Sequence, residues 1–351
     1  MGKKAGRLLK ILLIAAAGAA ILLLSSCENV QRAKTVKYIS EKYTVPDEKQ
    51  LIVYTSHKEE VYLPIIREFE NRTGIWVEVH AGGTGQMLEQ ARQASENGQC
   101  DIMFGGGIES YEASKDLFLP YRAQDREKLD PNYASVGNYY TPFTELPIVF
   151  IYNSKLVAQK DAPKSWKDLM SSRWKGKIAF ADMLNSGTSY TIVSTMEQLF
   201  EEPVDTLLPR FYEQLDGKVL SSSGQIIPKV SDGSFLVGIT LEETARKYMK
   251  AGYDISMVYP SDGTSAVPDG CAMVKNAPHS YNAGQFIDFV VSLDTQNYAM
   301  DEFFRRPIRQ DISLSAGYGR IKQIDFDIER SALEEPEILK LWSELTGKEG
   351  G

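Results

Sequence analysis

Histidine and cysteine are scarce in this chain of 351 residues, which has three of each. It also lacks a G-x-S-x-G elbow, a G-x-x-x-x-G-K-S/T loop and an H-E-x-x-H sequence, so no recognisable catalytic set is present. If Cys27 is modified as argued below, Cys100 and Cys271 remain, and they specify neither a disulfide framework nor a metal cluster. We therefore expect no enzyme, no metal and no cofactor. The alternative is a secreted phosphoester or glycoside hydrolase using a carboxylate pair such as Glu242 and Asp262.

Basic residues are fewer than acidic ones, with 39 Lys and Arg against 47 Asp and Glu. The formal net charge is −8, and it becomes −12 if the four basic residues of the first 26 positions are removed with a signal segment. This balance argues against a nucleic-acid partner. It does not argue against a small anionic ligand, because a local group of N–H donors and hydroxyls can bind an anion whatever the overall charge.

The first 26 residues have the order of an export signal: four basic residues and no acid, an apolar run, and small residues before Cys27. The run from Ile11 to Leu24 is shorter than the roughly 20 residues that a membrane span needs. The pattern resembles a bacterial lipoprotein signal, in which Cys27 becomes the lipidated first residue; an uncleaved anchor helix is the alternative. We expect the rest of the chain to work outside the cytoplasm, attached to the outer face of the cytoplasmic membrane or the periplasmic face of an envelope membrane. Residues 27–50 are polar and indicate a tether.

A short apolar strand at residues 177–181 leads into small polar residues and then a helix. Unpaired N–H groups in the first turn of a helix can hold an oxyanion. Asn185, Ser186, Thr188 and Ser189 add polar side chains there, and Gly187 lets the backbone approach closely. The stretch therefore predicts an anion site, with an ordinary helix N-cap as the alternative.

Residues 51–104 alternate strand, helix, strand, helix, strand, which predicts a parallel sheet. The strands end in small, hydroxyl or glycine residues, and ligands bind beyond the carboxyl ends of strands in such sheets. The candidate contacts are Thr55, Ser56, His57, Gly83 and Thr84. Plain tight turns are the alternative. A similar α/β pattern beginning near residue 146 predicts a second lobe.

Several segments together resemble the extracellular solute-binding proteins of ABC importers, in the group that includes ferric-ion, hexose-phosphate and phosphonate binders. The segments that carry this resemblance are 53–57, 73–75, 152–156, 165–169, 174–177 and 269–279. The resemblance implies a type II two-lobe α/β fold with mixed, mostly parallel sheets, two crossing strands and one ligand between the lobes. On that plan residues 51–145 with 265–325 form the first lobe, 146–264 the second, and 326–351 a C-terminal helix. The implied partners are the permease and its ATPase, and we expect a monomer.

The resemblance leaves the ligand open. Ferric binders of this group typically use two adjacent tyrosines after a strand of the second lobe, whereas residues 237–243 contain none; the pair Tyr139-Tyr140 falls before the crossover. We therefore favour a phosphate- or phosphonate-bearing organic anion over ferric ion. Residues 185–189 would hold the anion with help from Thr55, Ser56, Gly83 and Thr84.

At the other end of the ligand we expect Glu242 and Asp262-Gly263, since a carboxylate can accept from sugar hydroxyls or pair with an ammonium. Solvated roles for both acids, and a structural role for His57, are the alternatives. In the family layout the strands that begin near Cys100 and Cys271 are antiparallel neighbours, offset by four or five residues. At about 3.3 Å per residue this offset exceeds the roughly 7 Å limit for a disulfide, so we expect two free thiols.

Overall fold

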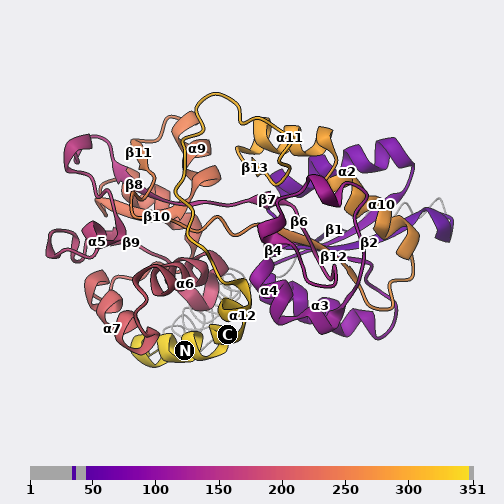
Figure 1. Cartoon of the computed structure of the whole chain (residues 1–351), viewed down its shortest axis with the longest axis horizontal. Helices are drawn as coiled ribbons and strands as arrows, with labels where there is room; N and C mark the ends of the chain where they lie inside the picture. The colour runs from indigo at the N-terminus through magenta and orange to yellow at the C-terminus, as the bar shows by residue number, and fades with distance from the viewer. Residues whose placement is uncertain (1–33, 37–44, 348–351) are drawn as a thin grey trace, which may run out of the picture.

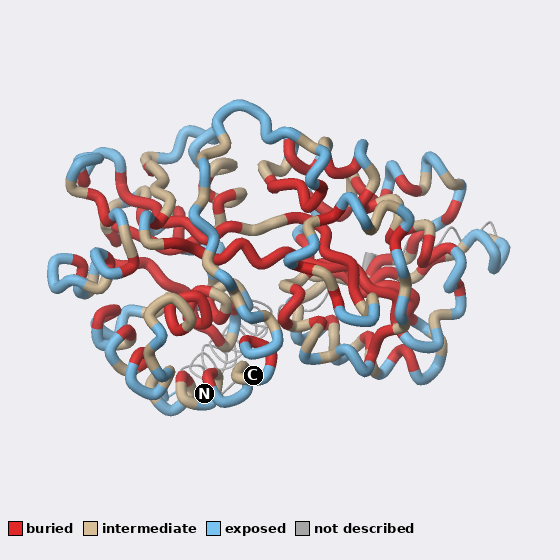
Figure 2. The backbone as a smooth tube through the Cα atoms, in the orientation of Figure 1, coloured by how far each residue is buried: buried red, intermediate tan, exposed pale blue. Residues whose placement is uncertain are grey.

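The computed structural model describes residues 34–36 and 45–347. Figure 1 shows two α/β lobes side by side, joined by segments that run across the middle, and the buried backbone of Figure 2 forms a separate interior in each lobe. The predicted two-lobe α/β architecture is therefore confirmed. The expected signal segment and Cys27 lie outside the described residues.

The first lobe is built on a seven-stranded mixed sheet. Its strands run in the spatial order β1 (Lys34–Val36), β3 (Trp76–Ala81), β2 (Gln50–Thr55), β4 (Ile102–Gly107), β12 (Asp269–Val274) and β5 (Phe118–Leu119), with β6 (Thr141–Pro142) also on β12. Strands β2, β3 and β4 are parallel, as their alternation with helices predicts, and β12 returns antiparallel to β4. The carboxyl ends of the three parallel strands thus meet at one edge of the sheet.

Helices cover both faces of this sheet and bury its apolar residues. They are α2 (Glu59–Thr73), α3 (Thr84–Ser95), α4 (Ile108–Ala113), α10 (Ser280–Val290) and α11 (Leu293–Phe303). Helix α2 shows the principle: Val61, Ile65 and Phe69 recur every four residues and are buried, while its other face carries charge. It ends at Gly74, whose φ of 65° supplies the left-handed C-cap conformation.

The two cysteines of this lobe are buried and unbridged. Cys271 of β12 lies opposite Phe104 of β4, four residues along the chain from Cys100. The register therefore confirms the predicted free thiols.

The second lobe contains a four-stranded sheet in the order β11 (Ile255–Val258), β8 (Ile148–Asn153), β10 (Val237–Leu241) and β9 (Ile178–Ala179). Strand β8 runs antiparallel to β10 and β11, while β9 and β10 are parallel. Its helices are α5 (Trp166–Leu169), α6 (Gly187–Phe200), α7 (Val204–Leu215), α8 (Ile226–Ser231) and α9 (Glu242–Lys250). Every residue of β8 is buried, as expected for a strand that is covered on both faces.

Three segments cross between the lobes. Residues 144–148 and 264–269 run side by side, since the Thr264 hydroxyl donates to the Ile148 carbonyl (2.8 Å) and the Phe143 N–H donates to the Asp269 carbonyl (2.7 Å). On the first-lobe side, β7 (Thr144–Glu145) pairs with β13 (Arg306–Pro307). Residues 308–327 make a third crossing, visible as the long loop in front in Figure 1, and the N–H of Thr264 donates to the carbonyl of Lys322 (2.9 Å) on the way. This third crossing adds to the two that the resemblance implies.

The third crossing delivers helix α12 (Ile328–Thr346) to the second lobe. Its Ile338 and Trp342 belong to that lobe's apolar core, and the Trp342 indole N–H donates to the Asp182 carboxylate (2.8 Å). The helix also packs on α4 of the first lobe (Figure 1). The expected C-terminal helix is therefore present and spans the junction between the lobes.

The structure differs from the tether expected for residues 27–50. Strand β1 adds to the sheet edge against β3, and Gln50 already belongs to β2. Among the residues that the structure describes, no helix is both long and apolar enough to cross a membrane.

Candidate functional site

A cavity of about 350 Å³ lies between the lobes, and its walls come from both of them. The first-lobe wall consists of residues at or after the carboxyl ends of β2, β3 and β4, namely Ser56, His57, Lys58, Glu60, Val61, Gly83, Thr84, Gly106, Gly107, Glu109 and Ser110. The second-lobe wall consists of Asn185, Ser186, Gly187, Thr188, Thr191, Ser223, Gly224, Ile227, Thr240, Leu241, Glu243, Thr244 and Tyr248. Leu146, Val267, Asp269 and Arg305, at or beside the crossing segments, complete the lining.

On the first-lobe wall, four of the five predicted residues line the cavity: Ser56, His57, Gly83 and Thr84. Thr55 does not. It is fully buried, its hydroxyl donates to the Phe104 carbonyl (2.7 Å) and accepts from the His57 N–H (3.2 Å), so it holds the turn that presents Ser56 and His57.

On the second-lobe wall, the first turn of α6 faces the cavity. Ser186 is the N-cap of this helix, and its hydroxyl accepts from the Ser189 N–H (3.2 Å), so the N-cap that was the alternative to an anion site is present. Ser189 is fully buried and does not line the cavity. The groups left for a ligand are the half-buried Thr188, the exposed Asn185 and the N–H groups of Gly187 and Thr188, which have no acceptor within the helix.

A buried charged cluster lies beside the crossing segments. Asp269 pairs with Arg305, and it accepts from the N–H (2.9 Å) and hydroxyl (2.8 Å) of Thr144. The Nε2 atom of His57 lies 3.4 Å from an Asp269 oxygen. Burial lowers the pKa of His57 to about 3, against the opposing effect of Asp269, so its imidazole is neutral at physiological pH.

Glu109 forms a side-chain hydrogen bond from one wall of the cavity to the other. It comes from α4 of the first lobe, is 3% exposed, and accepts from the hydroxyl of Thr191 on α6 (3.0 Å). Burial raises the pKa of Glu109 to about 7. At another point, Glu60 of α2 pairs with Lys247 of α9. The lobes therefore touch across the cavity in this structure.

Unpaired polar atoms converge on this cavity. In the part of the chain that the structure describes, seven buried side-chain nitrogen or oxygen atoms have no hydrogen-bond partner, and four of them belong to lining residues: Ser56 Oγ, His57 Nε2, Glu109 Oε2 and Arg305 Nε. Leaving such atoms unsatisfied costs about 1–3 kcal/mol each. A cavity that concentrates them is therefore suited to a ligand that completes their hydrogen bonds.

Three predicted residues lie elsewhere. Glu242 is fully buried and accepts from Tyr259 and from Arg306 Nε (2.5 Å) and Nη2 (3.1 Å), which ties α9 to β13. The carboxylate of Asp262 accepts from the Trp166 N–H (2.9 Å) at the start of α5, and the Gly263 carbonyl accepts from the Trp166 indole (2.9 Å). None of these three lines the cavity, because each is committed to packing within the protein.

The sequence reasoning missed Glu109, Asp269 and Arg305. Glu109 had a usable signal, since it follows the strand end at Gly105-Gly106-Gly107. The Glu109 carboxylate packs against Gly107, where a Cβ would lie 2.3 Å from both of its oxygens. Arg305 gives no local signal, because only the tertiary fold brings it to Asp269.

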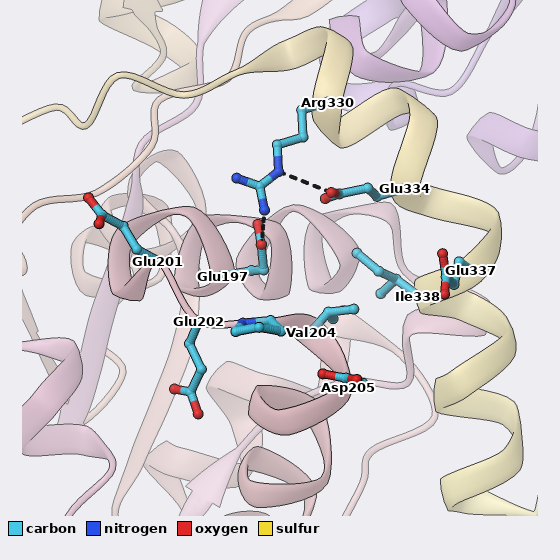
Figure 3. Close-up of a pocket in the computed structure, with 10 residues that line it drawn as sticks. Glu197, Glu201, Glu202, Val204, Asp205, Arg330, Glu334, Glu337 and Ile338 are labelled. Atoms are coloured by element: carbon cyan, nitrogen blue, oxygen red, sulfur yellow. Dashed lines mark hydrogen bonds and ion pairs between the residues drawn. The ribbon is translucent and has the colours of Figure 1, made fainter.

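A second cavity, of about 430 Å³, lies within the second lobe between α6, α7 and α12 (Figure 3). Its lining is rich in carboxylates: Glu197, Glu201, Glu202, Asp205, Glu334 and Glu337. Arg330 already occupies the space between two of them, pairing with Glu197 and donating from Nε to Glu334 (3.0 Å), as Figure 3 shows. So many carboxylates repel an anion, so the cavity between the lobes is the candidate site.

The structure places the tyrosine pair away from this site. Tyr140 is 6% exposed and its ring packs 6.0 Å from that of Tyr111, and neither Tyr139 nor Tyr140 lines the cavity. Tyr248 is the tyrosine of the lining. Among the described residues, no group of three His, Cys, Asp or Glu side chains is arranged to hold a metal ion.

Comparison with known proteins identifies the chain's relatives. Residues 101–318 match the family model described as bacterial extracellular solute-binding protein. A Salmonella typhimurium periplasmic protein whose name assigns it 2-aminoethylphosphonate binding is 24% identical over 257 residues, covering 70% of this chain and 74% of the relative.

Two solved structures extend the comparison. The periplasmic binding protein AfuA from Actinobacillus pleuropneumoniae, with fructose-6-phosphate bound, has a TM-score of 0.76 and 23% identity, covering 85% of this chain and 98% of its own. A ferric binding protein from Campylobacter jejuni also has a TM-score of 0.76, with 19% identity and coverages of 84% and 99%. These neighbours share the type II periplasmic-binding fold, and their ligands differ.

Proposed function

Because this chain belongs to the bacterial extracellular solute-binding proteins, the substrate-binding components of ABC importers, we propose that it captures a small organic anion bearing a phosphate or phosphonate. Hexose phosphates and aminoalkylphosphonates are the two ligand types of suitable size and charge. The ligand is held between the lobes and delivered to the permease. Binding, without chemical conversion, is the activity of the family, which argues against a phosphoester or glycoside hydrolase.

The observation that carries this proposal is the set of free donors on opposite walls of one cavity. Arg305 Nε and Ser56 Oγ are unpaired on one side, and the first turn of α6 with Thr188 faces them from the other. A phosphate or phosphonate has three charged oxygens and needs several donors, because a half-satisfied buried anion is costly. Because the donors come from both lobes, a ligand that bonds to all of them also holds the lobes together.

Substitution of Thr188 by alanine tests the anion subsite. Each hydrogen bond to a charged group contributes about 1.5–3 kcal/mol, so T188A should weaken binding of the responding phosphate or phosphonate roughly ten- to hundred-fold. Thr206 is the matched control, an exposed threonine in the first turn of α7 that lies outside the cavity. Calorimetry on T188A and T206A decides the matter: equal affinities for both variants and the parent would contradict the proposed subsite.

Ferric ion is the competing ligand, since iron binders stand among the structural neighbours. A hard trivalent cation favours phenolate and carboxylate oxygens, and the cavity supplies one tyrosine, Tyr248, rather than an adjacent pair. Tyr248→Phe separates the two ligand classes. It should leave binding of organic anions within about threefold, whereas an iron site would lose its visible absorption band.

We also propose that the protein is attached to the membrane through lipid on Cys27, from the order of charge, apolar run and small residues before it. Cys27→Ala should give an unprocessed or soluble product. A variant that is still cleaved after Ser26 and remains wholly in the membrane fraction would contradict this.

A further inference from the structure

We propose that Glu109 forms an ammonium subsite in the cavity between the lobes, so that the ligand carries a primary amine a short spacer away from its phosphate or phosphonate. This inference rests on the proposed function and narrows its ligand class from organic phosphates and phosphonates to zwitterionic ones. It assigns Glu109 two contacts at once, one to the opposite lobe and one to the ligand.

The geometry of Glu109 leaves one carboxylate oxygen for a ligand. Its Oε1 accepts from the Thr191 hydroxyl of the opposite lobe (3.0 Å), whereas its buried Oε2 has no hydrogen-bond partner. The carboxylate folds back over Gly107, and burial together with the hydrogen bond from Thr191 holds it there. A buried acceptor held in this way and left unpaired requires a donor from the ligand.

The anion subsite lies close by along α6. The Thr191 hydroxyl that contacts Glu109 is also 3.1 Å from the carbonyl of Gly187, the first residue of the helix. Glu109 Oε1 and the Gly187 carbonyl oxygen are therefore at most two hydrogen-bond lengths apart, which places the carboxylate beside the first turn of α6. A carboxylate at that distance repels a phosphonate, and an ammonium between the two would turn the repulsion into two attractions.

The remaining charges around Glu109 do not supply that cation. Glu335 of α12 adds to the effect of burial in raising the pKa of Glu109. Burial raises the pKa of Tyr140 and of Tyr190 on α6, and the negative charge of Glu109 raises both further. No lysine or arginine of the described residues forms an ion pair with Glu109, although Lys58 and Arg305 line other parts of the cavity. The competing arrangement is a protonated Glu109 that donates its hydrogen to the ligand's anion.

The two arrangements predict opposite pH dependences. The pKa of Glu109 is about 7, so a bound ammonium, which lowers it, favours the ionised carboxylate and releases a proton below pH 7. Affinity for the amine-bearing ligand, relative to an amine-free analogue, then rises between pH 6 and pH 8. A Glu109 that donates to the anion gives affinities that fall over the same range.

The experiment compares 2-aminoethylphosphonate with n-propylphosphonate on the unaltered protein by calorimetry at pH 6, 7 and 8. The ammonium of 2-aminoethylphosphonate lowers the second pKa of its own phosphonate below that of n-propylphosphonate. The contact between the amine and Glu109 is therefore measured by the ratio of the two affinities in the unaltered protein relative to the same ratio in Glu109→Gln at each pH. We expect 2-aminoethylphosphonate to bind the unaltered protein at least tenfold more tightly at pH 8, with a smaller relative ratio at pH 6. Glu109→Gln should reduce the ratio to within threefold, while the control Glu112→Gln, on the same helix but outside the cavity, should retain it.

Equal affinities of the unaltered protein for the two probes, or a ratio that Glu109→Gln leaves unchanged at every pH, would overturn the ammonium subsite and leave the proposed phosphonate binding intact. Binding of neither phosphonate, with glucose 6-phosphate binding normally, would overturn the subsite while the broader phosphate proposal stands. Binding of none of the three would overturn both.

Discussion

Replacing Glu242 by glutamine tests whether this residue belongs to the framework or to the ligand site. Glu242 is fully buried and Arg306 is 4% exposed, and Arg306 donates two hydrogen bonds to Glu242 between β13 and α9. The hydroxyl of Tyr259 donates a third hydrogen bond to Glu242. The substitution keeps the side-chain size but removes the charge. The buried Arg306 then loses its ion-pair partner.

The expected loss is large, because breaking a buried pair by removing one partner costs about 3–5 kcal/mol. With a urea dependence of about 3 kcal/mol per molar for a chain of this size, the unfolding midpoint should fall by about 1 M or more. Glu243→Gln is the matched control. Glu243 is the next residue of the same helical turn and is half-buried, so its substitution should change the unfolding free energy by less than about 1 kcal/mol.

Urea unfolding followed by circular dichroism measures the midpoints, and calorimetry measures ligand affinity for the folded variants. The double variant Glu242→Gln with Arg306→Met should recover part of the lost stability, since it also removes the buried positive charge. An unchanged midpoint combined with a tenfold loss of affinity would refute this reasoning and return Glu242 to the ligand site that the sequence first indicated.

In protein whose Cys27 is replaced, we expect a thiol reagent at pH 8 to leave Cys100 and Cys271 unmodified in the native state, because burial raises the pKa of both thiols. After denaturation the same reagent should count two thiols, because no disulfide joins them. Two blocked thiols after denaturation would contradict this prediction. Arg330→Met should lower stability, because Glu197, 2% exposed, loses its counter-charge. Burial raises the pKa of Glu197 above its value in the unfolded chain, so an ionised Glu197 without Arg330 destabilises the folded variant more as the pH rises. The decrease in the urea midpoint should therefore be larger at pH 8 than at pH 5. A larger decrease at pH 5 would contradict this prediction.

Local patterns were sufficient to predict most elements and the general position of the cavity. Alternation of apolar strands and amphipathic helices predicts the parallel part of the first sheet, and the geometry of parallel strands brings Ser56 and Thr84 to one edge. The small polar run before α6 likewise lies where it was expected, on the opposite wall.

The orientation of individual side chains could not be predicted in the same way. Successive residues of a helix point about 100° apart, so Glu243 lines the cavity whereas Glu242 turns inward to Arg306, 64 residues away in sequence. Ser189 turns inward near Thr188 for the same reason. Arg305 and Asp269 come together only in the folded chain, and the local pattern of apolar and polar residues does not indicate their contact.

The central claim is that the cavity between the lobes binds an organic phosphate or phosphonate. The most direct test is calorimetric titration of the ligand-free protein with glucose 6-phosphate, 2-aminoethylphosphonate, inorganic phosphate and ferric citrate. We predict saturable one-site binding of at least one organic anion, and its loss of roughly ten- to hundred-fold in affinity when Thr188 is replaced by alanine. Heat from ferric citrate alone, with a coloured complex and no response to either organic anion, would contradict the claim.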